Sequence, residues 1–212
     1  MRDPIRILLF GAGNRGADTY GQYGLDHPDE VQFVAVAEPN QIRRERFASR
    51  HHIRPEQQFT GWQEALSAGK IADAVLNATQ DHMHHASSLV ALGAGYDMLL
   101  EKPIAPTLQE TLDIIRAAEK SGHLLMICHV LRYTDFFKKV NAILKSNALG
   151  QIIHISQSEN VSYFHMAHSY VRGNWRNTAI SAPMILAKCC HDLDLLYWFL
   201  NEKATLLSST GR

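Results

Sequence analysis

The chain has 212 residues, of which 46% are hydrophobic and 20% are charged, and its 21 basic residues balance its 21 acidic residues. These proportions are typical of a globular protein and exclude disordered, collagen-like and coiled-coil sequences. The zero net charge gives no basic excess with which to bind nucleic acid or an anionic membrane surface. The apolar runs fall far short of the roughly 20 residues of a membrane span.

The chemistry of the cysteines and the start of the chain favour a cytoplasmic protein. The three cysteines are an odd number, and two of them, Cys189 and Cys190, are adjacent. This pattern is typical of reduced thiols and not of a disulfide framework. The opening residues lead directly into a strand pattern, so we expect no signal peptide.

The first part of the chain alternates strand patterns with helix patterns. Apolar runs predict strands at Ile5–Phe10, Val31–Ala37, Gln58–Thr60, Ala72–Thr79, Asp97–Leu100 and Leu124–Val130. Helices are predicted after the first strand, at Gln41–Arg50, at His84–Leu92, and from a capping box at Thr107 to Lys120. This alternation predicts an α/β domain over residues 1–130, with an open, mostly parallel, doubly wound sheet of the Rossmann type.

The pattern changes after residue 130. Helices are predicted from Thr134 to Asn147 and from Pro183 to Leu200, with partial period-two alternation over Gln151–Val161 and a final strand at Leu206–Ser209. A polar, aromatic-rich loop, Ser162 to Ala182, lies between them. We therefore expect residues 131–212 to form a partial α+β domain with an open, mostly antiparallel sheet.

A glycine-rich turn follows the first predicted strand. It reads Gly11-Ala12-Gly13-Asn14-Arg15-Gly16 and opens a predicted helix, which is the context that a dinucleotide-binding G-x-G-x-x-G motif requires. The glycines allow a tight turn, close approach of the backbone to a pyrophosphate and packing of the helix on the strand. The free N–H groups at the start of the helix suit phosphate oxygens.

An acidic residue stands where such a motif places its ribose ligand. Glu38 follows Gly16 by 22 residues (38 − 16), at the end of the second predicted strand. A carboxylate there accepts hydrogen bonds from both adenosine ribose hydroxyls and repels a 2′-phosphate, which favours NAD. Arg43 and Arg44 keep NADP open as an alternative. The alternative to the whole pattern is a plain glycine turn with a surface acid.

Glu101-Lys102-Pro103 ends the predicted strand Asp97–Leu100. Ligands of doubly wound sheets bind at the carboxyl ends of the strands, so Lys102 is placed to hydrogen-bond a substrate hydroxyl beside the nicotinamide. Pro103 biases Lys102 toward an extended conformation. A surface lysine at a strand end is the alternative interpretation.

The last predicted helix carries a second candidate base. Helical spacing places Lys188 and His191 on one face and an apolar stripe of Ile185, Cys189, Leu193, Leu196 and Leu200 on the opposite face. We therefore expect Lys188 and His191 to point away from the core, with Asp194 orienting His191 and Asp192 pairing with Lys188. A neutral imidazole held by a carboxylate is a plausible general base. A histidine on a solvated polar face is the alternative.

The long polar loop and the remaining histidines are less specific. Trp175, Arg176 and His165 have the side chains that bind sugar hydroxyls and stack on sugar rings, although a purely structural loop fits as well. Zinc ligands usually have C-x₂₋₄-C or H-x₃₋₅-H spacing, and the adjacent Cys189 and Cys190 on a helix would point about 100° apart, so we predict no metal.

Five segments in this order resemble the glucose-fructose oxidoreductase, inositol dehydrogenase and rhizopine-catabolism (Gfo/Idh/MocA) family. They are GAGNRG, AEPN at Ala37–Asn40, ATQDHMHH at Ala78–His85, EKP at Glu101–Pro103, and CHDLDLL at Cys190–Leu196. The resemblance covers essentially the whole chain. It implies an NAD(P)-dependent oxidoreductase that acts on CH–OH groups of sugars, sugar derivatives or cyclitols, and that forms homo-oligomers through the sheet of the second domain.

The resemblance also implies roles for individual residues. Lys102 matches the lysine of the family's EKP motif and His191 matches its catalytic histidine, while Thr79–His82 resembles the stretch beside the nicotinamide ribose and includes Thr79 and His82 as cofactor contacts. Many members carry an aspartate four residues before the histidine, and this chain has Ala187 there, followed by Lys188. This difference leaves the proton-transfer group open, with Lys188 as a further candidate.

Two other functions remain open at this point. One is a hydrolase or lyase that uses a tightly held NAD for transient oxidation, and the other is a sensor that binds the nucleotide without turnover. Family members continue well beyond position 212, so we expect the second-domain sheet to be incomplete in this chain or to be covered by a partner chain.

Overall fold

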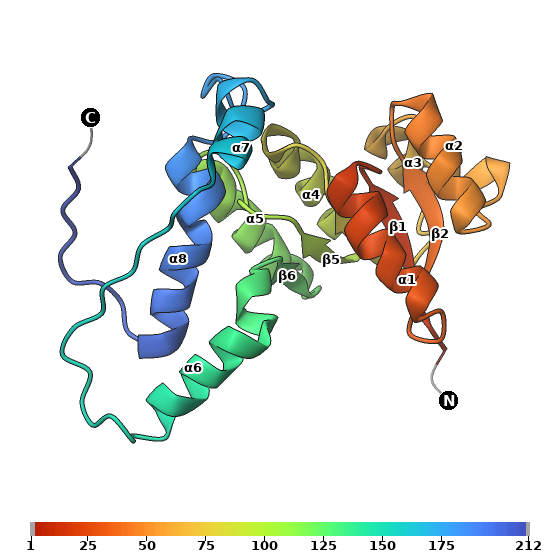
Figure 1. The fold of residues 1–212 in the computed structure, drawn as a ribbon. Helices are drawn as coiled ribbons and strands as arrows, with labels where there is room; N and C mark the ends of the chain where they lie inside the picture. The colour runs from red at the N-terminus through yellow and green to blue at the C-terminus, as the bar shows by residue number, and fades with distance from the viewer. Residues whose placement is uncertain (1–2, 211–212) are drawn as a thin grey trace.

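A computed structural model describes residues 3–210, so the outermost residues of the two expected units, 1–2 and 211–212, lie outside the described part. Its strands are β1 (Ile5–Phe10), β2 (Val31–Ala37), β3 (Gln58–Phe59), β4 (Ala74–Asn77), β5 (Asp97–Leu100) and β6 (Leu125–Ile127). They form a parallel sheet in the order β3-β2-β1-β4-β5-β6 (Figure 1). This order is that of doubly wound dinucleotide-binding sheets, so the predicted α/β Rossmann architecture is confirmed.

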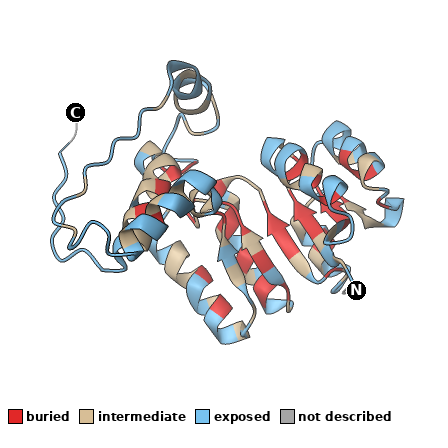
Figure 2. Ribbon diagram, turned by 60° about the horizontal axis from the view of Figure 1, so that its bottom comes forward, coloured by how far each residue is buried: buried red, intermediate tan, exposed pale blue. Residues whose placement is uncertain are grey.

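Helices cover both faces of this sheet. Wide helical turns at Asn14–Gly21, α1 (Gln22–Asp26) and α2 (Gln41–Arg50) pack on one face, and α3 (Trp62–Ser67), α4 (His84–Gly93) and α5 (Leu108–Ser121) pack on the other. Phe33 and Phe47 meet edge to face in the first layer, and Tyr96 is fully buried in the second. Figure 2 shows the buried residues concentrated in the strands. Burial on both faces explains why the strands are continuous apolar runs in the sequence.

The ends of α5 follow from its sequence. The hydroxyl of Thr107 accepts from the backbone N–H of Glu110, and the Glu110 carboxylate accepts from the backbone N–H of Thr107. Gly122 ends the helix in the left-handed conformation at φ 71°. This is the predicted capping box with a glycine C-cap. The short helix α3 was not predicted, because six residues give too little helical periodicity to recognise.

The chain beyond β6 is mainly helical. A helical turn at Val130–Tyr133 leads into α6 (Asp135–Lys145), and α7 (Tyr163–His165) with the turns at Met166–Val171 precedes α8 (Met184–Leu200). The Phe137 and Phe199 rings connect α6 to α8, with centroids 6.3 Å apart. Both helices lie beyond the β6 edge of the sheet (Figure 1). None of the helices within residues 3–210 is long and apolar enough to cross a membrane.

The strands predicted for the second unit do not form. Residues 151–161 and 206–209 carry no strand in the described chain, and most of them are exposed (Figure 2). A strand is stable only when neighbouring strands satisfy its backbone groups, and no such pairing is present within residues 3–210. The expected antiparallel sheet is therefore not seen in this structure.

The buried face of α8 is also different from the predicted one. Ala187, His191 and Leu195 are buried, whereas Ile185 and Leu193 of the expected apolar stripe are each 64% exposed. The prediction assumed that the most apolar face would point to the core. Instead, the helix packs on the Rossmann unit through a face that contains hydrogen-bonding groups, and this arrangement brings His191 inside.

Candidate functional site

The carboxyl ends of the strands lie level with one another. The paired residues at this edge are Ala37, Phe10, Asn77, Leu100 and Ile127, on β2, β1, β4, β5 and β6. The residues that follow them must therefore meet at the same edge of the sheet. They include several predicted site residues, namely Glu38, Gly11, Thr79, Glu101 and Lys102. This edge is where doubly wound sheets bind their ligands.

The glycine turn at the end of β1 requires glycine at two positions and leaves space at a third. Gly11 has φ 85°, and a Cβ there would lie 2.7 Å from the carbonyl oxygen of Ala78. A Cβ at Gly16 would overlap the carbonyl oxygen of Gly11, so the helix packs directly on the turn. A Cβ at Gly13 would meet nothing within 4 Å. The open side at Gly13 fits the close approach of a pyrophosphate, with exposed Asn14 and Arg15 in the first turn beside it.

Glu38 connects the glycine turn to the end of β2. Its buried carboxylate accepts from the backbone N–H of Ala12 at 2.8 Å and from that of Asn40 at 2.9 Å. One hydrogen bond on each oxygen leaves further lone pairs for ribose hydroxyls. The guanidinium of Arg44 donates to the carbonyl oxygen of Glu38 at 2.6 Å.

A hollow of about 240 Å³ lies beside the glycine turn, lined by Ala12, Gly13, Asn14, Ala17, Asp18, Arg43, Arg46, Phe47 and Arg50. Two of its arginines face Asp18, with Arg46 at 3.2 Å and Arg50 at 4.0 Å. Arg43 also lines it, whereas Arg44 bonds to the backbone. The residues thus fit an adenosine ribose next to Glu38, with cationic groups close by.

Glu101 and Lys102 lie at the end of β5. The Tyr20 hydroxyl donates to Glu101 Oε1 at 2.7 Å, and Arg15 Nε lies 3.9 Å from the same oxygen. Burial and the neighbouring carboxylate raise the pKa of Tyr20, so its hydroxyl keeps its proton. The Lys102 ammonium donates to the carbonyl oxygen of Ala187 at 2.8 Å, which connects the strand end to α8. Burial lowers the pKa of Lys102.

His191 lies on the face of α8 that packs toward this edge. Its side chain is largely inaccessible, and burial followed by the charge of Lys102 lowers its pKa to about 4. The imidazole is therefore neutral at pH 7. Lys188 lies close enough to contribute to this shift, and its ammonium pairs with Glu159 at 3.1 Å. Lys102 and Lys188 thus place positive charge near a neutral His191.

The predicted partners of the helix residues are different in the structure. Both oxygens of Asp194 accept hydrogen bonds from Arg132, each at 2.7 Å, and no hydrogen bond joins Asp194 to His191. Asp192 accepts from Gln157 rather than pairing with Lys188. The predictions considered only neighbours along the helix, whereas Arg132 and Gln157 reach α8 from other segments.

Thr79 and His82 follow β4 but have different environments. The Thr79 hydroxyl donates to Asn77 Oδ1 at 2.7 Å, and the carbonyl oxygen of Thr79 lies 3.2 Å from His84 Nε2. The other ring nitrogen of His84 lies 2.9 Å from the carbonyl oxygen of Pro103. Thr79 is thus held close to the turn that carries Lys102. The His82 side chain is half exposed beside Asp81.

Of the three residues predicted to bind substrate, only Trp175 is fixed to the strand edge. Its indole N–H donates to Asp81 Oδ2 at 3.1 Å, and the backbone N–H of Ala182 donates to the same oxygen at 2.8 Å. Arg176 donates to the carbonyl oxygen of Gly173, and His165 is exposed. The structure does not bring Arg176 and His165 to Lys102 or His191 by any contact recorded within residues 3–210.

Three residues that the sequence did not single out help to build this edge. Tyr20 bonds Glu101, Asp81 fastens the long loop, and His129 lies edge-on to His191 with ring centroids 5.9 Å apart. Asp81 and His129 each follow a strand of the sheet, a position that marks them as candidates. Tyr20 carries no comparable signal, because its contact with Glu101 spans 81 residues.

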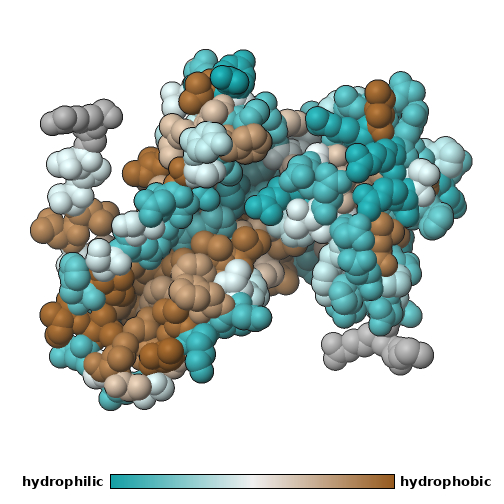
Figure 3. Space-filling model, viewed as in Figure 1, coloured by the Kyte–Doolittle hydropathy of each residue, from teal (hydrophilic) through white to brown (hydrophobic). Residues whose placement is uncertain are grey.

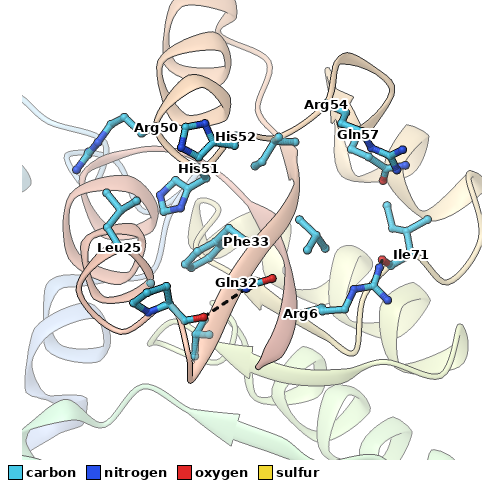
Figure 4. A pocket seen from close by; sticks show the side chains of 15 residues that line it. Arg6, Leu25, Gln32, Phe33, Arg50, His51, His52, Arg54, Gln57 and Ile71 are labelled. Carbon is cyan, nitrogen blue, oxygen red and sulfur yellow. Dashed lines mark hydrogen bonds between the residues drawn. The ribbon is translucent and has the colours of Figure 1, made fainter. Parts of the chain in front are cut away.

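A larger hollow lies elsewhere (Figure 4). It measures about 810 Å³ and is lined in part by Arg6, Val31 and His51. Arg6 and Val31 lie at or near the amino ends of β1 and β2, whereas Arg50 also lines the hollow beside the glycine turn. Within residues 3–210, no group of three or more histidine, cysteine and acidic side chains is arranged to hold a metal ion.

Known proteins share this architecture. Residues 5–129 match the model of the family described as "Oxidoreductase family, NAD-binding Rossmann fold". Inositol 2-dehydrogenase 4 from Saccharopolyspora erythraea is 27% identical over 205 residues, which cover 96% of this chain and 56% of that protein. The chain spans about half the length of the curated relatives that it matches.

Solved structures show the same fold at low sequence identity. The WlbA dehydrogenase from Chromobacterium violaceum, in complex with NADH and UDP-GlcNAcA, is 21% identical with a TM-score of 0.77, and the match covers 94% of this chain and 56% of that one. The myo-inositol 2-dehydrogenase from Lactobacillus plantarum is 18% identical with a TM-score of 0.80, covering 94% and 57%. The family model covers more than half of the chain and coincides with the strand order and glycine turn described above, so this protein belongs to the Gfo/Idh/MocA family of oxidoreductases with an NAD-binding Rossmann fold.

Proposed function

We propose that this protein is an NAD(P)-dependent oxidoreductase that transfers a hydride between nicotinamide and a hydroxyl or keto carbon of a sugar, sugar derivative or cyclitol. The observation that carries the proposal is the meeting of the glycine turn, Lys102 and His191 at one edge of the sheet. Residues 1–130 would bind the dinucleotide, and residues 131–212 would supply His191 and the remaining substrate contacts.

The residues at the carboxyl edge fit NAD better than NADP. The pyrophosphate would lie at Gly11, Gly13, Asn14, Arg15 and Gly16, and the ribose hydroxyls would bind Glu38. Arg44 donates a hydrogen bond to the backbone carbonyl of Glu38, and Arg46 forms an ion pair with Asp18. Both guanidinium groups are therefore less available to a 2′-phosphate. Arg43 keeps NADP open as an alternative. Thr79, His82 and Glu101 are the proposed contacts near the nicotinamide half.

The proposed reaction needs one group that accepts the proton of the substrate hydroxyl and another that stabilises the negative charge on its oxygen. The dinucleotide supplies the hydride acceptor when it is bound. His191, neutral at pH 7, takes the proton of the substrate hydroxyl. The Lys102 ammonium has three N–H groups, of which one donates to Ala187, so others can donate to the developing oxyanion. Lys188 adds positive charge that favours the same oxyanion.

The substrate class rests on relatives and on the groups that line the edge. Relatives include inositol dehydrogenases, and a similar structure holds UDP-GlcNAcA. Trp175 is held at the edge by Asp81, where an indole can stack on a sugar ring. Arg176 and His165 would need to move toward this edge to bind hydroxyl or carboxylate groups.

A substrate screen tests this function. We expect NADH to form when the protein is supplied with NAD and the correct polyol, and the Lys102→Ala and His191→Ala variants to lower kcat about 10²-fold or more. Lys120→Ala, on the exposed side of α5, is the matched control and should keep the wild-type rate. Unchanged rates in both site variants on a real substrate would refute the assigned roles.

Position 187 supports a second candidate function. The backbone carbonyl of Ala187 accepts a hydrogen bond from Lys102, but its side chain offers no carboxylate to His191. The protein could then be a sensor that binds the nucleotide without turnover. It could also be a hydrolase or lyase that oxidises its substrate transiently and forms no net NADH. In these cases NADH would bind, but no polyol or keto sugar would give net oxidation. A hydrolase or lyase would consume its substrate under these conditions, and a sensor would not.

We also propose that the protein forms a homo-oligomer through the second unit. The exposed side chains at the end of α8 and in the segments near residues 153 and 207 provide apolar surface there, including Ile153, Leu200 and Leu207. Figure 3 shows apolar side chains gathered over the part of the surface formed by α6 and α8. Burial of such a surface in a contact between subunits would be favourable.

A further inference from the structure

Two histidines from distant parts of the sequence meet behind the proposed site. His129 follows β6 and His191 lies in the middle of α8, and their rings are nearly perpendicular at 80° with centroids 5.9 Å apart. Nothing in the sequence pattern links them. Their proximity gives His191 a neighbour that can exchange protons.

Each of these rings has a buried nitrogen that lacks a partner. The Nδ1 atoms of His129 and His191 are both shielded from solvent and make no hydrogen bond with any group in residues 3–210. Buried polar atoms in proteins are almost always hydrogen-bonded, to protein or to an ordered water. One water placed between the two Nδ1 atoms would satisfy both of them, because a water both donates and accepts.

The charges around the two rings differ. His191 faces the ammonium groups of Lys102 and Lys188, which disfavour a proton on its ring. His129 Nε2 lies 3.9 Å from Asp194 Oδ1, which favours a proton there, although Arg132 and Lys102 oppose it and Glu101 adds a smaller attraction. Asp194 is in turn held by two hydrogen bonds from Arg132. The one carboxylate at ion-pair distance therefore faces His129.

His129 also lines a groove that is open to solvent. This groove of about 560 Å³ runs between the Pro103 turn and α8, and both His129 and Asp194 line it. The rest of its wall is mostly apolar, with Ile104, Ile185 and Leu193 among its residues. The groove therefore gives a proton at His129 a route to solvent.

We propose that His129 is the positioning residue of His191: it fixes the tautomer of His191 and passes the proton from the substrate to the groove through one bridging water. This proposal rests on the proposed function. Before reaction, His191 carries its proton on Nδ1 and presents the free Nε2 to the substrate hydroxyl. His129 accepts at Nδ1 and carries its own proton on Nε2, toward Asp194.

The proton steps balance without any further reactant. The substrate O–H bond breaks and an N–H bond forms at His191 Nε2, while the hydride from the same carbon passes to the dinucleotide. His191 Nδ1 gives its proton to the bridging water, which gives one to His129 Nδ1. His129 releases its Nε2 proton to water in the groove. Both rings end neutral in their other tautomers, with the proton on His191 Nε2 and on His129 Nδ1, and one proton has left the site. The same transfers in reverse, with a proton taken from groove water at His129 Nε2 and the Nε2 proton of His191 released to water after the product leaves, restore the starting tautomers.

Nitrogen NMR of the ring atoms tests this pairing without turnover. In the wild-type protein at pH 7, we expect a single His191 tautomer with the proton on Nδ1. His129→Gln should give a mixture of His191 tautomers, whereas the control His27→Gln, at a surface histidine, should leave the signal unchanged. An Nε2-protonated His191 in the wild-type protein, or an unchanged His191 signal in His129→Gln, would overturn the proposal, and the wild-type spectrum tests it even if the variant does not fold.

A kinetic measurement then distinguishes proton transfer by His129 from a purely structural role of this residue. Once a substrate that the protein oxidises is known, His129→Gln should lower kcat about tenfold with little change in KM. The variant should also displace the pH profile of kcat, because Lys102, Lys188 and Asp194 would be the remaining groups that face His191. An unaltered pH profile would overturn the relay. Failure of the wild-type protein to oxidise any substrate would count against the proposed function, whereas the ring-nitrogen spectra would still decide whether His129 fixes the tautomer of His191.

Discussion

Glu38 shows how one side chain serves both the fold and the candidate site. Its carboxylate accepts from the N–H of Ala12 and that of Asn40, so it fixes the glycine turn relative to the end of β2. Sequence spacing was sufficient to locate this residue, because the motif sets the distance between the turn and the acid. Its hydrogen bonds to the backbone of Ala12 and Asn40 were not predicted, because they depend on how the glycine turn folds against the end of β2.

Replacing this carboxylate should weaken both roles. We expect Glu38→Gln to lower the free energy of unfolding by about 1–2 kcal/mol, because an amide has one acceptor oxygen for two backbone N–H donors. The same change should reduce affinity for NADH about tenfold. Calorimetric titration and urea unfolding would measure the two effects, with the exposed Glu56→Gln as control. Equal NADH affinity in the two variants would contradict the ribose assignment.

His191 should make stability depend on pH. Its pKa in the folded protein is about 4, below the value of about 6.5 for an unfolded chain, so between these pH values the unfolded state binds more protons. Stability is therefore complete above about pH 6.5 and falls toward pH 4, by about 1–3 kcal/mol from this residue.

Urea unfolding at pH 7 and pH 5 measures this effect. The His191→Gln variant should lose less stability than the wild-type protein over this interval. His51, whose pKa is also lowered to about 4 by burial, should preserve part of the pH dependence in the variant. An equal loss in the two proteins would show that His191 is not held neutral by the fold.

At the scale of elements, the Rossmann part and the helices α6 and α8 were predictable, and the sheet expected in the second part was not. Parallel strands are buried on both faces, so Ile5–Phe10 and Val31–Ala37 appear as continuous apolar runs, and caps such as Thr107 mark the ends of helices. The alternating pattern over residues 151–161 could not give a strand alone, because strand formation depends on partner strands. The orientation of α8 depends on hydrogen bonds from Lys102 and Arg132. These residues lie outside the helix, so the spacing of residues within the helix cannot reveal them.

The capping box of α5 allows a test at this scale. Thr107→Ala removes the hydroxyl that accepts from the N–H of Glu110, and it should lower the free energy of unfolding by about 1 kcal/mol. Thr205→Ala, at an exposed position without a hydrogen bond in the structure, is the control and should change it by less than about 0.5 kcal/mol. Denaturant titration measures both variants, and an equal effect would argue against the cap.

At the scale of the whole molecule, the two units are joined by polar contacts and leave apolar surface on the outside. Lys102 bonds to Ala187 and Trp175 bonds to Asp81, each across a long stretch of sequence. Neither of these pairs could be recognised from local patterns, which explains why the meeting of Lys102 with His191 needed the family resemblance. The apolar stripe of α8 remains exposed in the single chain.

Self-association should depend on this stripe. We expect Leu200→Glu to shift the protein toward monomer in light scattering, because a carboxylate cannot be buried in an apolar contact without a large cost. Ile42→Glu on α2, at a residue 77% exposed, is the matched control and should leave the association state as in the wild-type protein. An unchanged oligomer in Leu200→Glu would contradict the proposed interface.

The most direct test of the dinucleotide site is calorimetric titration of NADH into the wild-type protein and the Gly13→Ala variant. The added methyl group meets no protein atom within 4 Å, so the fold should remain intact while the group occupies the path of the pyrophosphate. We predict at least about tenfold weaker NADH binding with an unchanged unfolding temperature, and wild-type affinity in the control Gly93→Ala, whose methyl group also meets open space. Wild-type affinity in Gly13→Ala would contradict the placement of the cofactor at this turn.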